Sequence, residues 1–364
     1  CAGPQSAKNV LLNPAVEAAV LETARGGILR AGLGFDQCDV AVVTNIGDGD
    51  HLGVAGINTP EDIAKVKRTI VDVVHKHGYA VLKADDKLTA DMASYCPGQV
   101  IFFCRDPQHS VIVEHRKNGG RAVIVRDGEI VAAEGDREER MLSLEHVPLT
   151  HRGLIGFQVE NALATVAAAW GLGLSRETIR VGLQTFAADM EKVPGRFNLL
   201  EVHGATVIVD YGHNPSALEA MIDAIELFPA TRRLAVYTAA GDRRDCDMIR
   251  QGEQLGEAFD RVILYEDHYL RGRPQGEIMG LIRQGLARGE RVTEIEDVFG
   301  AVKAIEVALD SLQPGDLLLL QADVIDETVE YVKRYLAAHK DDREPTLVEA
   351  LPMPEVVYAT ESID

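Results

Sequence analysis

The chain has 364 residues, 46% of them hydrophobic and 26% charged, which is the composition of a folded enzyme with two or three domains. A formal net charge of -20, with no Lys/Arg-rich run to offset it, argues against nucleic acid as a partner, because phosphates are repelled. The five cysteines form no C-x-x-C pair, and no apolar run reaches the roughly 18 residues that span a bilayer. We therefore expect a cytoplasmic protein with reduced thiols that does not enter membranes.

The first half of the chain opens in the middle of a pattern, which we interpret as a truncation upstream of Cys1. Short apolar runs that end in polar residues predict buried parallel strands at 16–21 and 38–44. A helix is predicted between Thr59 as N-cap and Gly78 as C-cap. The later elements of this half are expected to be strands at 79–82, 100–103, 122–125 and 129–132, and helices at 158–170 and, capped by Ser175, up to about 186.

After Gly195 and Arg196 the pattern restarts as alternating strands and helices, which predicts a second α/β domain with a mostly parallel sheet. Residues from about 341 onward mix proline, acidic and isolated apolar residues and predict a tail. The expected strands of the second domain are 206–210, 234–237, 262–265, 292–294 and 317–321, and the expected helices are 216–228, 251–259, 276–288, 298–312 and 327–338.

Polar side chains follow the first two predicted strands, at the point where each strand ends. In LETARGGILR, residues 21–30, Glu22 ends a strand and the Gly26-Gly27 pair follows it. Enzymes with α/β folds place a metal ligand beside a bound phosphate in this way, although an ordinary turn has the same pattern. In TNIGDGDHLG, residues 44–53, the next strand is followed by oxygen and imidazole groups that could hold Mg²⁺ between the two strand ends: Asn45, Asp48, Asp50 and His51.

These two blocks resemble the signature of the cyanophycin synthetases, a branch of the Mur ligase superfamily that polymerises aspartate and arginine. The resemblance implies a partial Mur ligase central domain over 1–196, a Rossmann-like C-terminal Mur ligase domain over 197–340, and a tail over 341–364. It also implies an ATP-dependent and Mg²⁺-dependent amide ligase. Such an enzyme converts a side-chain carboxylate of an aspartate polymer to an acyl phosphate, which the α-amine of arginine attacks.

The resemblance also implies roles for residues of the central domain. Glu22 and His51 take the metal and phosphate site, while Asn45 and Asp50 shape the loop beside it. Lys67, whose spacing fits better than that of Lys65, corresponds to a lysine that is carbamylated in many Mur ligases; a solvated helix lysine is the alternative. In KADD, residues 83–86, Lys83 stands where the superfamily has asparagine.

Further roles follow for the hinge and the second domain. Asn161 corresponds to a residue that contacts adenine, and Arg196, in PGR, to a hinge arginine that reaches the ATP phosphates through its planar fork. The block DYGHNP, residues 210–215, contributes Asp210, His213 and Asn214 to the nucleotide side. Two basic loops, GDRRD and DHYLRGRP, are expected to meet phosphate or an acidic polymer, although solvated turns are the alternative, and their candidate residues are Asp242, Arg243, Arg244, Asp267, Arg271 and Arg273.

The chain departs from the family pattern in one important respect. It contains no Gly-Lys pair, so the phosphate-binding loop G-x-x-G-K-[ST] is missing, and so is the ATP-grasp half that would add aspartate. We therefore expect this chain to be inactive alone and to act with that N-terminal half, as a homo-oligomer. Two alternatives stay open: another Mur-type ligase, similar to folylpolyglutamate synthetases, and a non-catalytic homologue used for assembly or polymer binding.

Overall fold

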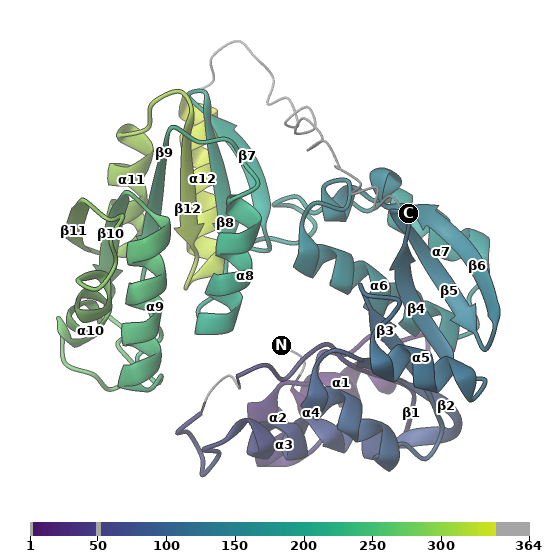
Figure 1. Ribbon diagram of the computed structural model, residues 1–364. Helices are drawn as coiled ribbons and strands as arrows, with labels where there is room; N and C mark the ends of the chain where they lie inside the picture. The colour runs from purple at the N-terminus through teal and green to yellow at the C-terminus, as the bar shows by residue number, and fades with distance from the viewer. Residues whose placement is uncertain (1–2, 49–51, 340–364) are drawn as a thin grey trace, which may run out of the picture.

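The computed structural model describes residues 3–48 and 52–339, which form two α/β units (Figure 1). The first unit is built on a six-stranded sheet of order β1-β2-β3-β4-β5-β6, in which β1 to β4 are parallel and β5 and β6 are antiparallel. Its strands are β1 (Cys38–Val43), β2 (Val74–Lys83), β3 (Gln99–Cys104), β4 (Arg121–Arg126), β5 (Glu129–Glu134) and β6 (Arg137–Ser143).

Helices cover both faces of this sheet. Successive strand residues point to opposite faces, so Val81 packs with the core under α6 while Leu82 packs with the core under α3 and α5. The helices of this unit are α1 (Pro4–Leu11), α2 (Arg25–Ala31), α3 (Pro60–Asp72), α4 (Lys87–Ala90), α5 (Ser110–Lys117), α6 (Gly156–Gly171) and α7 (Arg176–Thr185).

The second unit has a six-stranded sheet of order β11-β10-β9-β12-β8-β7, in which only the β7–β8 pair is antiparallel. Its central strand β12 is buried along its whole length, as a strand covered on both faces should be. The strands are β7 (Asn198–Val202), β8 (Ala205–Asp210), β9 (Arg232–Tyr237), β10 (Arg261–Glu266), β11 (Glu294–Phe299) and β12 (Asp316–Gln321).

Five helices flank this second sheet and make the unit doubly wound (Figure 1). Three pack on one face: α8 (Pro215–Ile225), α9 (Asp245–Ala258) and α10 (Glu277–Leu286). Two pack on the other: α11 (Ala301–Asp310) and α12 (Ile325–Ala338). Among the described helices of the chain, none is both long and apolar enough to cross a membrane.

An apolar cluster joins the two units at the hinge. Phe197 is 1% exposed and packs in the core of the second unit, where Ile155 and Phe157 from the start of α6 join it. The predicted domain boundary after residue 196 falls between α7, the last helix of the first unit, and β7. The predicted tail lies outside the described residues.

Most elements predicted from the sequence are present, but two predictions are wrong. Residues 16–21 are not a strand: they have no regular secondary structure and are mostly exposed, with Val20 97% exposed, and no neighbouring strand pairs with them among the described residues. The helix that begins after Thr59 ends at Asp72, and Gly78 lies inside β2 instead of capping the helix. A Cβ on Gly78 would stand 2.3 Å from the backbone oxygen of Asp39, so this glycine allows β1 and β2 to approach each other.

The smaller differences concern edge strands and the start of one helix. The expected strand at 292–294 is β11, which begins at Glu294 and runs to Phe299, and α11 starts only after Gly300 at a φ of 92°. The antiparallel edge strands β6 and β7 were not predicted. The first four residues of β6 are charged or polar and exposed, so their sequence lacks the apolar alternation of a half-buried strand.

Candidate functional site

A cavity of about 990 Å³ lies along the outer edge of β1. It is lined mainly by the segment 16–24 and α2, by β1 with the residues on either side of it, by the middle of α3 and by the end of α6. Asp242 lines it from the second unit. The cavity therefore brings together residues that are far apart in the sequence, and these include four that the sequence analysis selected, Glu22, Asn45, Lys67 and Asp242, together with Arg25.

The position of the cavity follows from the order of the sheet. Strand β1 is an edge strand, paired with β2 on one side, and the cavity occupies its other side. Ile63 and Ile70 of α3 wall it on one face of the sheet, and Ala168 and Leu172 of α6 wall it on the other. Strand β1 therefore leaves one edge of the first sheet unpaired in the described part of the chain.

The loop after β1 is held by Asp86, a residue to which the sequence analysis gave no role. One oxygen of this carboxylate accepts the backbone N–H groups of Ile46 and Gly47, each at 2.8 Å, and the other accepts that of Thr89 at 2.9 Å. Burial alone would raise the pKa of Asp86, but the N–H donors outweigh it and the pKa is lowered. The one sequence signal for this role was the position of Asp86 as N-cap of α4.

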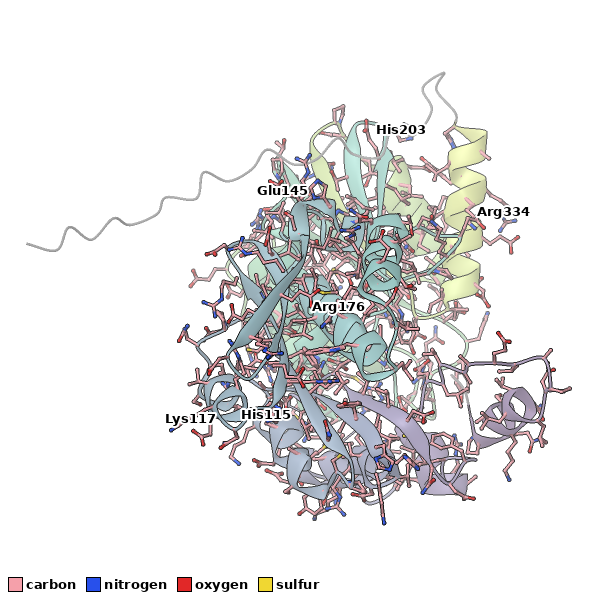
Figure 2. All side chains as sticks on the ribbon, turned by 90° about the vertical axis from the view of Figure 1, so that its right-hand side faces the viewer. His115, Lys117, Glu145, Arg176, His203 and Arg334 are labelled. Atoms are coloured by element: carbon pink, nitrogen blue, oxygen red, sulfur yellow. The ribbon has the colours of Figure 1, made fainter. Side chains whose placement is uncertain are left out.

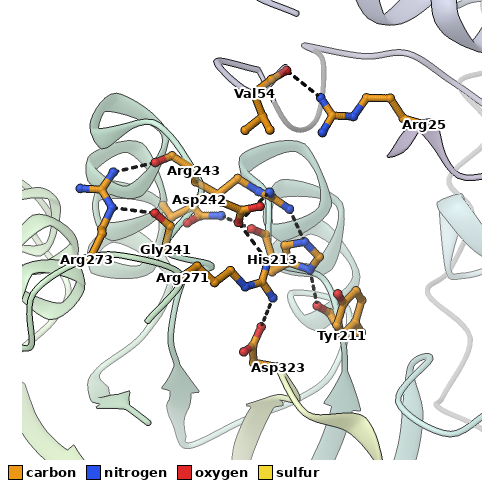
Figure 3. A network of polar contacts seen from close by, with 11 residues as sticks. Arg25, Val54, Tyr211, His213, Gly241, Asp242, Arg243, Arg271, Arg273 and Asp323 are labelled. Carbon is orange, nitrogen blue, oxygen red and sulfur yellow. Dashed lines mark hydrogen bonds and ion pairs between the residues drawn. The ribbon is translucent and has the colours of Figure 1, made fainter. Parts of the chain in front are cut away.

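The predicted metal and phosphate residues lie close to this loop. The ammonium group of Lys67 donates to the backbone oxygen of Asn45 at 3.2 Å, which ties α3 to the end of β1. Arg25, at the start of α2, donates to the backbone oxygen of Val54 at 3.2 Å (Figure 3). Glu22 is exposed and lines the same cavity.

The metal assignment itself stays a prediction. Asp50 and His51 lie outside the described residues. Within 3–48 and 52–339, no group of three or more His, Cys, Asp or Glu side chains gathers in a way that could hold a metal ion. Glu22 and Asn45 are nevertheless oxygen donors on one cavity, and Mg²⁺ is commonly bound by one or two carboxylates with water completing its shell.

Asn161, the predicted adenine contact, lies in the first turns of α6. Its side-chain amide donates to Gln158 at 3.0 Å, and the neighbouring Glu160 pairs with Lys83 at the end of β2 at 2.7 Å. Lys83, the first residue of the KADD block and the last residue of β2, therefore connects the carboxyl end of this strand to α6. Asn161 does not line the cavity beside β1, and its adenine role stays a prediction.

The hinge presents Arg196 between two left-handed residues. Gly195 has a φ of 67° and Phe197 a φ of 50°, and the guanidinium of Arg196 lies over the ring of Tyr211, 5.0 Å from its centre. The carboxylate of Asp210 accepts the backbone N–H groups of Phe197 at 2.9 Å and Gly212 at 2.6 Å, and burial raises its pKa. Asp210 thus braces the turn that carries Arg196, a contact that the sequence did not indicate.

His213 and Asn214 have clear partners in the second unit. Nδ1 of His213 contacts the backbone oxygen of Tyr211 at 3.2 Å, and Nε2 contacts the guanidinium of Arg243 (Figure 3). A guanidinium can only donate, so Nε2 accepts and the proton resides on Nδ1 of a neutral ring. Asn214 caps α8 by accepting the N–H of Ala217 at 2.8 Å.

The arginines of the two basic loops form one polar network with nearby carboxylates. Asp242 accepts from Arg271 at 2.9 Å and from Arg243 at 3.2 Å, and Arg271 also lies 3.6 Å from Asp323 (Figure 3). Arg243 is buried, at 4% exposed.

The other two arginines hold the backbone and helix ends. Arg273 donates to the backbone oxygens of Gly241 and Arg243, both at 2.7 Å, which joins the two loops (Figure 3). The guanidinium of Arg244 forms a bidentate ion pair with the carboxylate of Asp247 in the first turn of α9, and both N···O distances are 2.8 Å. The substrate roles of these arginines stay predictions, and Asp242 is the member of the network that also lines the cavity.

Comparisons with known proteins agree with this architecture. The sequence model of the Mur ligase middle domain matches residues 3–169, and that of the Mur ligase glutamate ligase domain matches residues 195–323. The structure of Escherichia coli FolC in complex with ADP superposes with a TM-score of 0.59 at 20% identity, over 83% of this chain and 63% of that chain. The chain therefore belongs to the Mur ligase superfamily and contains regions that match its middle and C-terminal domains.

Within this superfamily the chain is a homologue of the cyanophycin synthetases. The cyanophycin synthetase of Crocosphaera subtropica is 40% identical over 332 residues, and that of a Synechocystis species is 40% identical over 331 residues. In each case the alignment covers 91% of this chain and 38% of the relative. The chain thus spans little more than a third of the length of these relatives.

Proposed function

We propose that this chain is the Mur ligase part of an ATP-dependent ligase that joins the α-amine of arginine to the side-chain carboxylate of an aspartate polymer. The observation that carries the proposal is the convergence of Glu22, Asn45 and Lys67 on one cavity that Asp242 completes from the other domain. A reaction site between two domains suits a ligase, because closure excludes water from a reactive acyl phosphate.

The side chains of the cavity have distinct tasks in this proposal. Glu22 and His51, the latter outside the described residues, are the proposed ligands of Mg²⁺, which would neutralise charge on the transferred phosphoryl group, and Asn45 shapes the loop beside them. Lys67 fixes the loop after β1 through the backbone of Asn45. Outside the cavity lining, at the hinge, Arg196 is the proposed phosphate ligand, because a planar guanidinium can bind phosphate oxygens through two hydrogen bonds.

We propose that His213, as a neutral ring, positions Arg243 and does not bind phosphate as a charged ligand. Its ring orders Arg243, which in turn contacts Asp242 at the wall of the cavity. We assign recognition of the charged substrates to this network, because it presents both carboxylates and guanidinium groups within one cluster. Adenine contact by Asn161, and nucleotide contacts by Asp210 and Asn214, belong to the same proposal.

The whole protein is proposed to be a cytoplasmic homo-oligomer in which an N-terminal ATP-grasp half adds aspartate. The sequence contains no Gly-Lys pair to build a phosphate-binding loop. This chain alone is therefore expected to bind Mg·ATP only near 1 mM, about −4 kcal/mol.

An amine-dependent assay of phosphate release from ATP tests the proposal. The chain joined to its upstream sequence is supplied with Mg·ATP, an aspartate oligomer and one amine at a time: arginine, lysine, ornithine or glutamate. We expect release with arginine and loss of that release in Glu22→Gln, whereas Glu114→Gln, an exposed residue of α5, keeps it.

The pattern of amines separates the alternatives. Turnover with glutamate and a folate-like acceptor instead of arginine would place the chain with the folylpolyglutamate-type ligases. Binding of the aspartate polymer without any turnover would make it a non-catalytic homologue. Arginine turnover at a normal rate in Glu22→Gln would refute the metal assignment while leaving the substrate assignment intact.

A further inference from the structure

Residues 45–48, here called the β1 loop, contact both domains of the molecule. Within the middle domain, the loop is gripped through the backbone N–H groups of Ile46 and Gly47, which both donate to Asp86. At its far end, the carboxylate of Asp48 accepts from Arg250 at 2.7 Å, and Arg250 belongs to α9 of the C-terminal domain. One short loop thus joins the wall of the cavity to the other domain.

Two side chains of the C-terminal domain lie near glycines of this loop and of the segment that follows it. A Cβ built on Gly47 would lie 3.7 Å from the hydroxyl of Ser216 at the start of α8, which is van der Waals contact. A Cβ on Gly53 would lie 3.3 Å from a side-chain carbon of Arg244, just before α9. Other side chains of the C-terminal domain therefore lie close to the ion pair between Asp48 and Arg250.

Arg250 has a second carboxylate partner within its own domain. Its other terminal nitrogen lies 3.5 Å from Glu219 on α8. When Asp48 is released, Arg250 therefore keeps Glu219 as a partner. The contact between the domains can break without leaving the guanidinium of Arg250 unpaired. The three side chains are 46% (Arg250), 63% (Asp48) and 59% (Glu219) exposed, and exposed ion pairs are weak and are screened by salt.

We propose that Asp48 and Arg250 form a releasable latch between the middle and C-terminal domains, and that Asp86 is the positioning residue that holds the middle-domain half of the latch in place. The latch has the strength expected of a contact that opens and closes in every reaction cycle. The proposal concerns domain closure and stands independently of the ligase activity, so its test needs no substrate.

The distance between the domains is the quantity to measure. Lys117 on α5 and Arg334 on α12 are exposed and lie on different domains (Figure 2). Replacing both with p-acetylphenylalanine allows spin labelling without touching the native cysteines, and double electron–electron resonance then gives the distribution of distances. In Arg250→Gln, we expect the ratio of closed to open molecules to fall by about 3- to 5-fold, as for the loss of one exposed ion pair.

The control variants distinguish a latch from a general loosening. Glu219→Gln removes the other partner of Arg250 and should keep the closed fraction at or above the wild-type level. Salt at 0.5 M should lower the closed fraction of the wild type and leave that of Arg250→Gln unchanged. Asp86→Asn should lower the closed fraction and add little when it is combined with Arg250→Gln, because both act through one contact.

Two results would overturn the proposal. An unchanged distance distribution in Arg250→Gln refutes the latch, and Asp48→Asn, which changes only an exposed side chain, gives a second measurement if the first variant folds poorly. Fully additive effects of Asp86→Asn and Arg250→Gln refute the positioning role of Asp86. Thermal melts followed by circular dichroism verify that each variant is folded.

Discussion

Replacing Asp86 with alanine removes one carboxylate that accepts three backbone N–H groups, those of Ile46, Gly47 and Thr89, at 2.8 to 2.9 Å. Hydrogen bonds to a charged group contribute about 1.5–3 kcal/mol each, but Asp86 is only half-buried and water can replace part of what is lost. We therefore take a value below this range, about 1 kcal/mol for each bond as for an ordinary hydrogen bond, and expect the middle domain to lose about 3 kcal/mol of its free energy of unfolding.

The single tryptophan makes this loss measurable in a two-domain chain. Trp170 lies on α6 and packs against the core of the middle domain, so its fluorescence follows the unfolding of that domain in urea. Asp85→Ala is the matched control. Asp85 is exposed enough, and its contact with Lys83 long enough at 3.9 Å, that we expect a change below about 0.5 kcal/mol.

The effect of Asp86→Ala should also depend on pH. The pKa of Asp86 is lowered in the folded protein, so its stabilising contribution is complete above the unfolded pKa of about 3.9. It is lost as the pH falls through the lower folded value. The difference in the free energy of unfolding between wild type and Asp86→Ala should be constant from pH 6 to 8 and should become smaller below about pH 4. A loss under 0.5 kcal/mol at pH 7, or a difference that grows in acid, would refute this reasoning.

Three further predictions concern other parts of the molecule. Arg196→Lys in the upstream-extended chain should lower kcat/KM for ATP by roughly 10- to 100-fold, because the planar fork is lost, and an unchanged value contradicts the hinge role. Gly78→Ala should cost about 3 kcal/mol or prevent folding, since its Cβ meets a backbone oxygen of β1 at 2.3 Å, whereas Gly182→Ala, with open space around it, should be neutral or stabilising; urea unfolding compares them. Iodoacetamide at pH 8 should alkylate the exposed Cys246 many-fold faster than Cys104, whose pKa burial raises to about 11, and mass spectrometry of peptides decides this.

The sequence was sufficient to predict helices that begin with a capping residue and strands that are continuous apolar runs. Thr59 caps α3 through a full capping box with Asp62, and Ser175 caps α7, as predicted. The continuous apolar run of β12 is a strand buried on both faces. The blocks around Glu22 and Asn45 also identified residues that do line one cavity.

Predictions that depended on a neighbour in space were the ones that failed. Residues 16–21 have the composition of a buried strand, but a strand needs a partner to satisfy its backbone, and none lies beside this segment in the described structure. A glycine after a helical pattern is typical of a helix C-cap. Gly78 instead lies within β2, where the backbone of Asp39 in β1 leaves no room for a side chain. The same local sequence was compatible with both outcomes.

The sequence by itself determined the alternation of strands and helices, the superfamily, and the residues that end the strands. Only the tertiary structure decided what those residues touch: that Asp86 holds the β1 loop, that Asp210 braces the hinge, and that Asp48 meets Arg250 across 202 positions of sequence. The physical reason is that capping and periodicity act within a few residues, whereas hydrogen bonds and ion pairs between distant segments exist only after both sheets have packed and set the distances between their ends.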